Sequence, residues 1–151
     1  MILYLVRHGD LIANPDSLTP LGERQAEAVG RRLAMVGLDR IYSSSSNRAI
    51  QTATPAAEMT KKKITVLDWC NEKYIAEQLT VHRDGKKVGG FLFENPETRL
   101  QLNSPAVRAL GDRWYEAFPQ TPYEEGIRRI QTESDAFLLS LGYRHDRENA
   151  C

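Results

Sequence analysis

The chain has 151 residues, the size of one ordinary domain that can bury its own core without disulfides or structural metal ions. Its 20 Lys and Arg side chains balance 20 Asp and Glu side chains, so no overall field would hold the protein on a nucleic acid or an anionic membrane. The two cysteines and three histidines lack metal-ligand spacing, and no apolar run could span a bilayer. We therefore expect one cytoplasmic domain over residues 1–151, with neither cofactor nor metal ion.

Short apolar runs alternate along the chain with segments of helical period, a pattern typical of an α/β domain. We expect a mainly parallel central sheet with helices on both faces. Residues 2–6 form a continuous apolar, β-prone run, which predicts a buried first strand that ends at Arg7. A second strand is predicted around Ile41 and Tyr42, and a third over residues 64–67.

The first predicted helix has clear start and stop signals. Thr19 followed by Pro20 is typical of an N-cap with proline at the first helical position, and Gly37 is the expected stop signal after Val36. We expect three apolar side chains of this helix to point inward: Leu21, Ala28 and Leu33. A second helix should begin near Asn47 and be kinked or ended by Pro55.

The second half of the chain has weaker patterns. Residues 74–103 contain several turn signals, which predicts a long irregular insertion over one end of the sheet, on the substrate side. Ser104 and Pro105 should open a helix that reaches Phe118. A last helix is predicted over residues 123–141, with apolar residues at helical spacing and a glycine directly after it.

Polar residues that directly follow strands are the first candidates for a ligand site in such a sheet, because ligands sit outside the carboxyl ends of the strands. The first strand is followed by Arg7, His8 and Gly9, which combine a guanidinium, an imidazole and a residue that lets a ligand approach the backbone. The second is followed by four serines and then Arg48, at the start of a helix whose backbone N–H groups also favour an anion. These residues predict a phosphoryl pocket.

Three ordered segments extend this interpretation to a known family. The segments are Leu5-Val6-Arg7-His8-Gly9-Asp10 with Asn14 beyond it, Leu18-Thr19-Pro20-Leu21-Gly22-Glu23-Arg24-Gln25-Ala26, and Tyr42-Ser43-Ser44-Ser45-Ser46-Asn47-Arg48-Ala49-Ile50-Gln51-Thr52-Ala53. Together they resemble the opening third of histidine phosphatases of the phosphoglycerate-mutase-like superfamily. Asp10 stands where the family commonly has Glu, and Ser45 where Pro is common.

The resemblance implies a role for each matching residue. His8 would accept the phosphoryl group, Arg7 and Arg48 would clamp it, and Asn14 would donate to its oxygens. The chemistry agrees, because phosphoryl transfer needs in-line placement and positive charge around the phosphoryl oxygens. A neutral imidazole is the required nucleophile, and a hydrogen bond from its other nitrogen to a backbone carbonyl would set the tautomer.

The leaving alkoxide needs a proton, which the family takes from a carboxylic acid after its third strand. Glu72 is our choice, and Asp68 and Glu77 remain alternatives because the family's pattern is spelled differently here. The family's second catalytic histidine has no match in the sequence, since neither His82 nor His145 has the expected surroundings. We therefore expect a chain that stops early and is incomplete at the C-terminal side of the fold. Such a chain should either be prone to aggregation or form a homo-oligomer by borrowing a strand from another copy.

The leading hypothesis is a phosphatase that hydrolyses a small phosphorylated substrate, a phosphomonoester, through a phosphohistidine on His8. A phosphoglycerate-type mutase is the alternative within the same family, although residues 74–103 do not match the insertions of its mutases. A non-catalytic phosphate-binding module is the alternative from another class.

Overall fold

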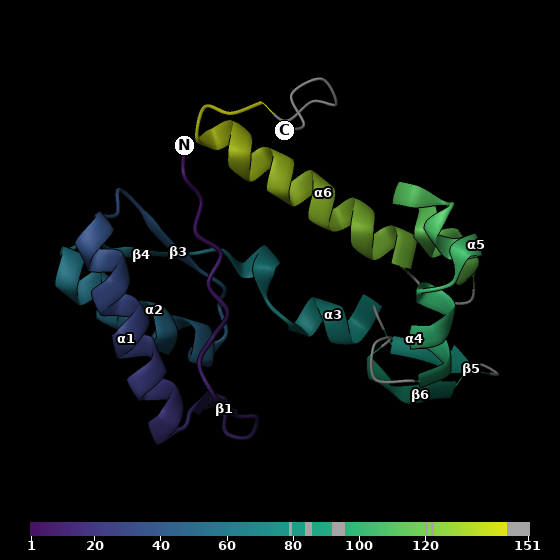
Figure 1. Cartoon of the computed structure of the whole chain (residues 1–151), viewed down its shortest axis with the longest axis horizontal. Helices are drawn as coiled ribbons and strands as arrows, with labels where there is room; N and C mark the ends of the chain where they lie inside the picture. The colour runs from purple at the N-terminus through teal and green to yellow at the C-terminus, as the bar shows by residue number, and fades with distance from the viewer. Residues whose placement is uncertain (79, 84–85, 92–95, 120, 122, 145–151) are drawn as a thin grey trace. The chain divides into compact units, whose positions relative to one another are not determined.

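The computed structural model of the chain describes residues 1–78, 80–83, 86–91, 96–119, 121 and 123–144 (Figure 1). Its contacts group the residues into two compact units, Met1–Asn71 and Glu72–Cys151, which we call the first and the second unit. In chain order the first unit contains β1 (Leu11–Ile12), β2 (Ser17–Leu18), α1 (Pro20–Val36), β3 (Ile41–Ser43), α2 (Asn47–Thr60), β4 (Ile64–Val66) and the 3-10 helix η1 (Asp68–Cys70).

The described strands form three separate two-stranded sheets in place of the predicted central sheet. β3 and β4 are parallel, with Ile41 opposite Ile64, and α2 connects them as the crossover helix. β1 and β2 form a short antiparallel pair next to α1. The parallel character that the sequence predicts is therefore present in one pair, and both of the strands predicted after the first are confirmed in it.

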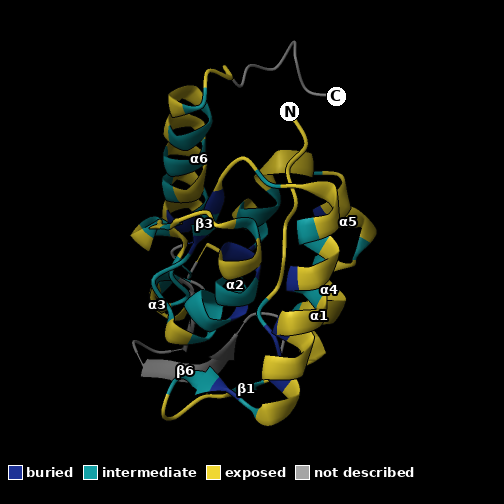
Figure 2. Ribbon diagram, turned by 90° about the vertical axis from the view of Figure 1, so that its left-hand side faces the viewer, coloured by how far each residue is buried: buried dark blue, intermediate teal, exposed yellow. Residues whose placement is uncertain are grey.

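The prediction of a first strand over residues 2–6 is wrong. No strand is assigned before Leu11, and the side chains from Met1 to Val6 are exposed, that of Leu5 to 89% (Figure 2). The physical reason is that an apolar run becomes a strand only when a neighbouring strand takes its backbone hydrogen bonds. Among the described residues no strand pairs with this segment.

Helix α1 has the predicted ends but a different inward face. Thr19 Oγ1 accepts from the Gly22 N–H at 3.1 Å, and Gly37 ends the helix with a φ of 78°. The buried positions are the small residues Gly22, Ala26 and Gly30, whereas Leu21 and Ala28 are exposed and Leu33 is only partly buried. Small residues occupy this face because other backbone lies close to it.

Two of these glycines mark the close approaches. A Cβ at Gly30 would lie 2.9 Å from the backbone nitrogen of Ala56, so α1 and α2 pack almost backbone to backbone (Figure 1). A Cβ at Gly22 would lie 2.0 Å from the carbonyl oxygen of Asp10. The first turn of α1 is thus pressed against the segment that follows His8.

The core of the first unit lies between α2 and the parallel pair. Ile41, Ala56 and Ala57 are buried together, with three half-buried apolar side chains packed on them: Leu38, Ala53 and Ile64. Helix α2 continues through Pro55 to Thr60, so the proline does not end it. This core fixes α2 against β3 and thereby positions the beginning of the helix.

The second unit is mostly helical. Its described elements are α3 (Lys73–Gln78), β5 (Thr80–Arg83), β6 (Lys86–Phe91), α4 (Pro96–Leu102), α5 (Pro105–Arg108), the 3-10 helix η2 (Gly111–Ala117) and α6 (Tyr123–Ser140). Tyr123 is fully buried against Phe118 and Trp114, with both ring centroids 5.7 Å away. Among the described helices, none has the length and apolarity that a membrane crossing requires.

Two predictions for this half of the chain need correction. Residues 74–103 contain α3, an antiparallel β5–β6 pair and α4 where we predicted an irregular insertion, because turn signals also separate short regular elements. The helix predicted from Ser104 to Phe118 is divided into α5 and η2 at Gly111, whose φ is positive. The last helix, α6, is confirmed.

We expect Gly22→Ala to destabilise the protein although alanine is the better helix former. The added Cβ would collide with the backbone oxygen of Asp10, which cannot rotate away as a side chain would. The free energy of unfolding, measured with urea, should fall by roughly 1–3 kcal/mol. Arg24→Ala, at an exposed position of the same helical turn, is the control and should change it little. A Gly22→Ala protein as stable as the wild type would contradict the close approach.

Candidate functional site

His8 is held in one tautomer by the backbone. Its ring is half-buried, and Nδ1 lies 2.8 Å from the carbonyl oxygen of Gly9. A carbonyl can only accept, so Nδ1 must donate, and in a neutral imidazole Nε2 then keeps its lone pair. The hydrogen bond predicted from the sequence is present, and the Nε2 lone pair takes no part in it.

The residue after His8 is joined to α2 through a buried hydroxyl. The Gly9 N–H donates to Thr52 Oγ1 at 3.1 Å, and the same hydroxyl donates to the carbonyl oxygen of Arg48 at 2.7 Å. Gly9 and Thr52 are both buried and lie 43 positions apart in the sequence. This relay connects the backbone of Gly9, the residue after His8, to the backbone of Arg48.

Arg48 lies in the first turn of α2 and contacts a carboxylate that the sequence did not single out. Its Nη1 donates to Asp16 Oδ1 at 2.6 Å, and only 14% of the Arg48 side chain is exposed. The other carboxylate oxygen of Asp16 accepts from the backbone N–H of Asn47 at 2.7 Å. The start of α2 therefore binds a carboxylate of the protein itself, and the predicted binding of a phosphoryl group there stays a prediction.

The charge of Asp16 follows from these contacts. Burial alone would raise the pKa of Asp16, but the hydrogen bond and the charge of Arg48, with the backbone N–H of Asn47, outweigh burial and hold the pKa below its usual value. Asp16 is therefore an anion at neutral pH.

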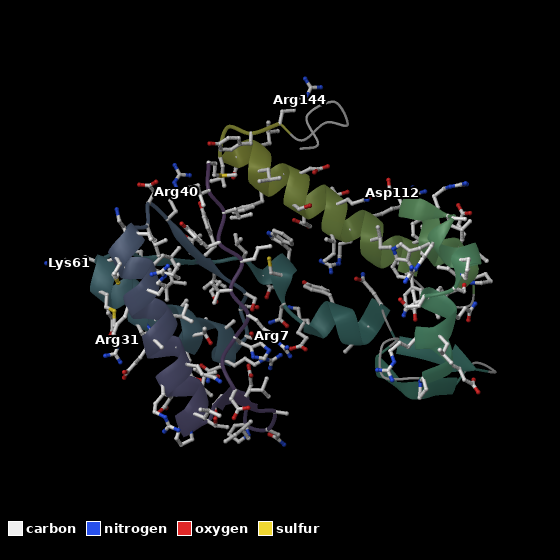
Figure 3. The ribbon with its side chains drawn as sticks, in the orientation of Figure 1. Arg7, Arg31, Arg40, Lys61, Asp112 and Arg144 are labelled. Atoms are coloured by element: carbon white, nitrogen blue, oxygen red, sulfur yellow. The ribbon has the colours of Figure 1, made fainter. Side chains whose placement is uncertain are left out.

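Asn14 and Arg7 lie on the segments that flank this pair. Asn14 is exposed in the turn between β1 and β2, two residues before Asp16, so its turn is tied to the start of α2. Arg7 is exposed next to His8 on the extended N-terminal segment (Figure 3). The structure thus gathers the segments that carry four predicted residues, His8, Arg7, Asn14 and Arg48, around the beginning of α2.

The serine-rich segment before α2 is joined to the turn after β4. Ser45 Oγ donates to Asp68 Oδ1, and Asn71 Nδ2 donates to Ser45 Oγ at 2.7 Å. Ser44 and Ser46 share a hydrogen bond of 3.0 Å between their hydroxyls. The carboxyl ends of the two parallel strands therefore lie at one edge of the pair. The hydroxyl groups of Ser44, Ser45 and Ser46 lie at this edge, directly before Arg48 in the sequence.

The predicted general acids are divided between the two units. Asp68 shares the first unit with His8 and accepts from Ser45. Glu72 lies in the second unit directly before α3, half-buried, and Glu77 lies exposed within α3. His82 falls in β5, and His145 lies outside the described residues. Within the described part of the chain, no cluster of three metal-binding side chains occurs.

Sequence reasoning missed the residues that hold the site together. Thr52 belongs to the third of the sequence segments that resemble the family, one helical turn after Arg48. On α2 it lies on the same buried side as Ala56 and Ala57, and a threonine at a buried helical position was the signal that could have identified it. Gln51 Oε1 accepts from the Leu18 N–H at 2.7 Å and fixes β2 to α2. Asp16 had no signal beyond its place in a turn.

The comparisons with known proteins identify the family of the chain. Residues 3–81 match the family described as the histidine phosphatase superfamily (branch 1), a range that contains every predicted site residue. No curated protein sequence matches the chain. A solved structure described as "Mycobacterial hydrolase 1" is similar at 22% sequence identity with a TM-score of 0.39, over 68% of this chain and 47% of that protein, so this chain spans about half its length.

We expect Thr52→Val to weaken the relay at the centre of this site. Valine keeps the shape of threonine but cannot accept from the Gly9 N–H, and a buried donor left without its partner costs about 1–3 kcal/mol. Thr52→Ser is the matched control, because it keeps the hydroxyl and loses one methyl group. The free energy of unfolding should fall further for valine than for serine; the opposite order would show that packing, and not the hydroxyl, holds these segments together.

Proposed function

Because the chain belongs to the histidine phosphatase superfamily, we propose that it is a phosphatase that hydrolyses a phosphomonoester through a phosphohistidine on His8. The observation that carries this proposal is the hydrogen bond from His8 Nδ1 to the Gly9 carbonyl oxygen. It orients the ring and leaves the Nε2 lone pair for attack on phosphorus.

The proposed reaction has two steps. Nε2 of His8 attacks phosphorus while the bond to the substrate's ester oxygen breaks, so the phosphoryl group moves to the ring and an alcohol leaves. Glu72 donates the proton that the leaving oxygen needs, with Asp68 and Glu77 as alternatives. A water molecule then attacks the phosphohistidine and gives a proton to the carboxylate, which releases inorganic phosphate and restores both the ring and the acid.

Arg7, Arg48 and Asn14 would bind the transferred group. Negative charge on the phosphoryl oxygens must be balanced throughout the transfer, and a planar guanidinium can contact two of these oxygens at once. Arg48 suits this task because its side chain is mostly buried and its first helical turn is fixed by the Thr52 relay. Transfer to a second substrate in place of water would make the protein a mutase, and binding without transfer a phosphate-binding module.

We expect His8→Ala to abolish hydrolysis of p-nitrophenyl phosphate, with a loss of roughly a thousandfold or more, as for other removed nucleophiles. The variant should stay folded by circular dichroism, because His8 is a half-buried pocket residue and not part of the core. His82→Ala is the control and should keep its activity. Retained turnover in His8→Ala would remove His8 as the nucleophile.

The intermediate gives an independent check. A phosphoryl group on a histidine nitrogen is stable in alkali and labile in acid, whereas a phosphoserine behaves in the opposite way. Protein denatured in alkali during turnover should carry the group at His8 by mass spectrometry and lose it after acid treatment. A phosphoserine at residues 43–46 would contradict the mechanism.

We expect Arg48→Lys to lower kcat/KM for p-nitrophenyl phosphate by about tenfold or more, equivalent to roughly 1.4 kcal/mol of transition-state stabilisation. Lysine keeps the charge but loses the planar fork. Arg31→Lys makes the same change on the exposed face of α1, where Arg31 contacts Glu27 at 2.8 Å, and should leave the kinetics unaltered (Figure 3). Equal kinetics for Arg48→Lys and Arg31→Lys would place Arg48 outside the phosphate site.

A further inference from the structure

The ion pair between Asp16 and Arg48 joins distant parts of the first unit. The pair with Arg48 spans 32 positions, whereas Arg31 and Glu27 lie one helical turn apart. We infer that Asp16 is a positioning residue, which orients the Arg48 guanidinium for the phosphoryl group and ties the turn of Asn14 to the same place. This inference rests on the proposed function.

The Asp16 carboxylate is fixed without help from Arg48. Its second oxygen accepts from the Asn47 N–H, and its backbone carbonyl oxygen accepts from Asn47 Nδ2, both at 2.7 Å. Two residues later, the Leu18 N–H is bound by Gln51. Because α2 itself holds both sides of Asp16, the carboxylate is a fixed anchor toward which the longer and more mobile arginine turns.

Burial makes the contact stronger than an ordinary surface ion pair. Arg48 is 14% exposed and Asp16 32%, whereas both partners of the Arg31–Glu27 pair are exposed. Surface pairs hold long side chains weakly, since water screens the charges and both chains keep their rotamer freedom. A contact shielded on both sides can therefore restrict Arg48 to one orientation.

The form of the contact explains how one carboxylate can orient Arg48. Nη1 donates to Asp16 Oδ1, and because the guanidinium is planar and rigid, a contact at one of its nitrogens limits the directions in which its other N–H donors can point. The Asp16 carboxylate also places a negative charge near the phosphate, and the gain from a fixed orientation must outweigh this repulsion.

The role of Asp16 can be tested by asking whether its effect depends on Arg48. If Asp16 acts through Arg48, its replacement matters only while the guanidinium is present. Asp16→Asn keeps the size and one acceptor oxygen but loses the charge and the second acceptor. Binding of inorganic phosphate by calorimetry and kcat/KM for p-nitrophenyl phosphate should be measured for the wild type, Asp16→Asn, Arg48→Lys and the double variant, all with the full chain.

We expect Asp16→Asn to weaken phosphate binding and to lower kcat/KM by about tenfold each, roughly the effect of one charge-assisted hydrogen bond. In the Arg48→Lys background the same change should have less than about a twofold effect. Asp16→Glu, which keeps the charge, should recover part of the loss and serves if the asparagine variant folds poorly. Glu27→Gln is the matched control, since it removes a carboxylate charge from an exposed arginine and should change neither measurement.

Other results would overturn the inference. An equal loss in both backgrounds would give Asp16 a structural role only, and tighter phosphate binding by Asp16→Asn would make it a competitor of the substrate. A wild type that binds phosphate and is unaffected by either Asp16 variant leaves the proposed function standing without the inference. A wild type that neither binds phosphate nor hydrolyses the ester removes both.

Discussion

The arrangement of the first unit depends on one buried hydroxyl. Thr52 Oγ1 receives the Gly9 N–H and donates to the Arg48 carbonyl oxygen, so a single atom joins the extended N-terminal segment to the helix that carries the arginine. Within the described part of the chain the N-terminal segment pairs with no strand, and its side chains are mostly exposed, so its position depends on a few polar contacts near Gly9. A buried donor and acceptor satisfied by one side chain make such a link specific, because any displacement leaves them unpaired.

Helix α2 gathers the remaining contacts of the site along one edge. Its alanines pack on β3, its Pro55 turn lies against Gly30 of α1, and its first turn holds Asp16 through Asn47 and Arg48. The apolar half of the helix thus fixes its place, while its first turn holds the β1–β2 turn and Thr52, one turn later, holds the N-terminal segment. This division of roles has a physical reason. Burial of apolar side chains stabilises the helix but does not depend on orientation, whereas a hydrogen bond forms only at a particular distance and angle.

Local signals predicted the elements whose causes are local. The ends of α1 follow from Thr19 and Gly37, whose capping roles depend on their own backbone. The predicted strand over residues 2–6 is not present in the structure, because the apolar composition of a segment does not show whether another strand is there to pair with it. The inward face of α1 was also missed. Apolar periodicity selected Leu21, but the helix turns Gly22 and Gly30 inward, where other backbone segments come close to it.

The candidate site likewise has parts that depend on neighbouring residues and parts that depend on contacts between distant segments. The hydrogen bond between the His8 imidazole and a neighbouring carbonyl and the position of Arg48 at a helix start were predictable, because each is defined by residues close together in the sequence. The residues that hold them were not. Thr52 acts across 43 positions and Asp16 across 32, so their roles exist only once two segments have folded together. A carboxylate two residues after Asn14 looks like an ordinary turn residue until Arg48 is beside it. Chemistry-bearing side chains are limited to a few residue types, whereas a positioning contact can be made by any donor or acceptor that the fold brings within reach.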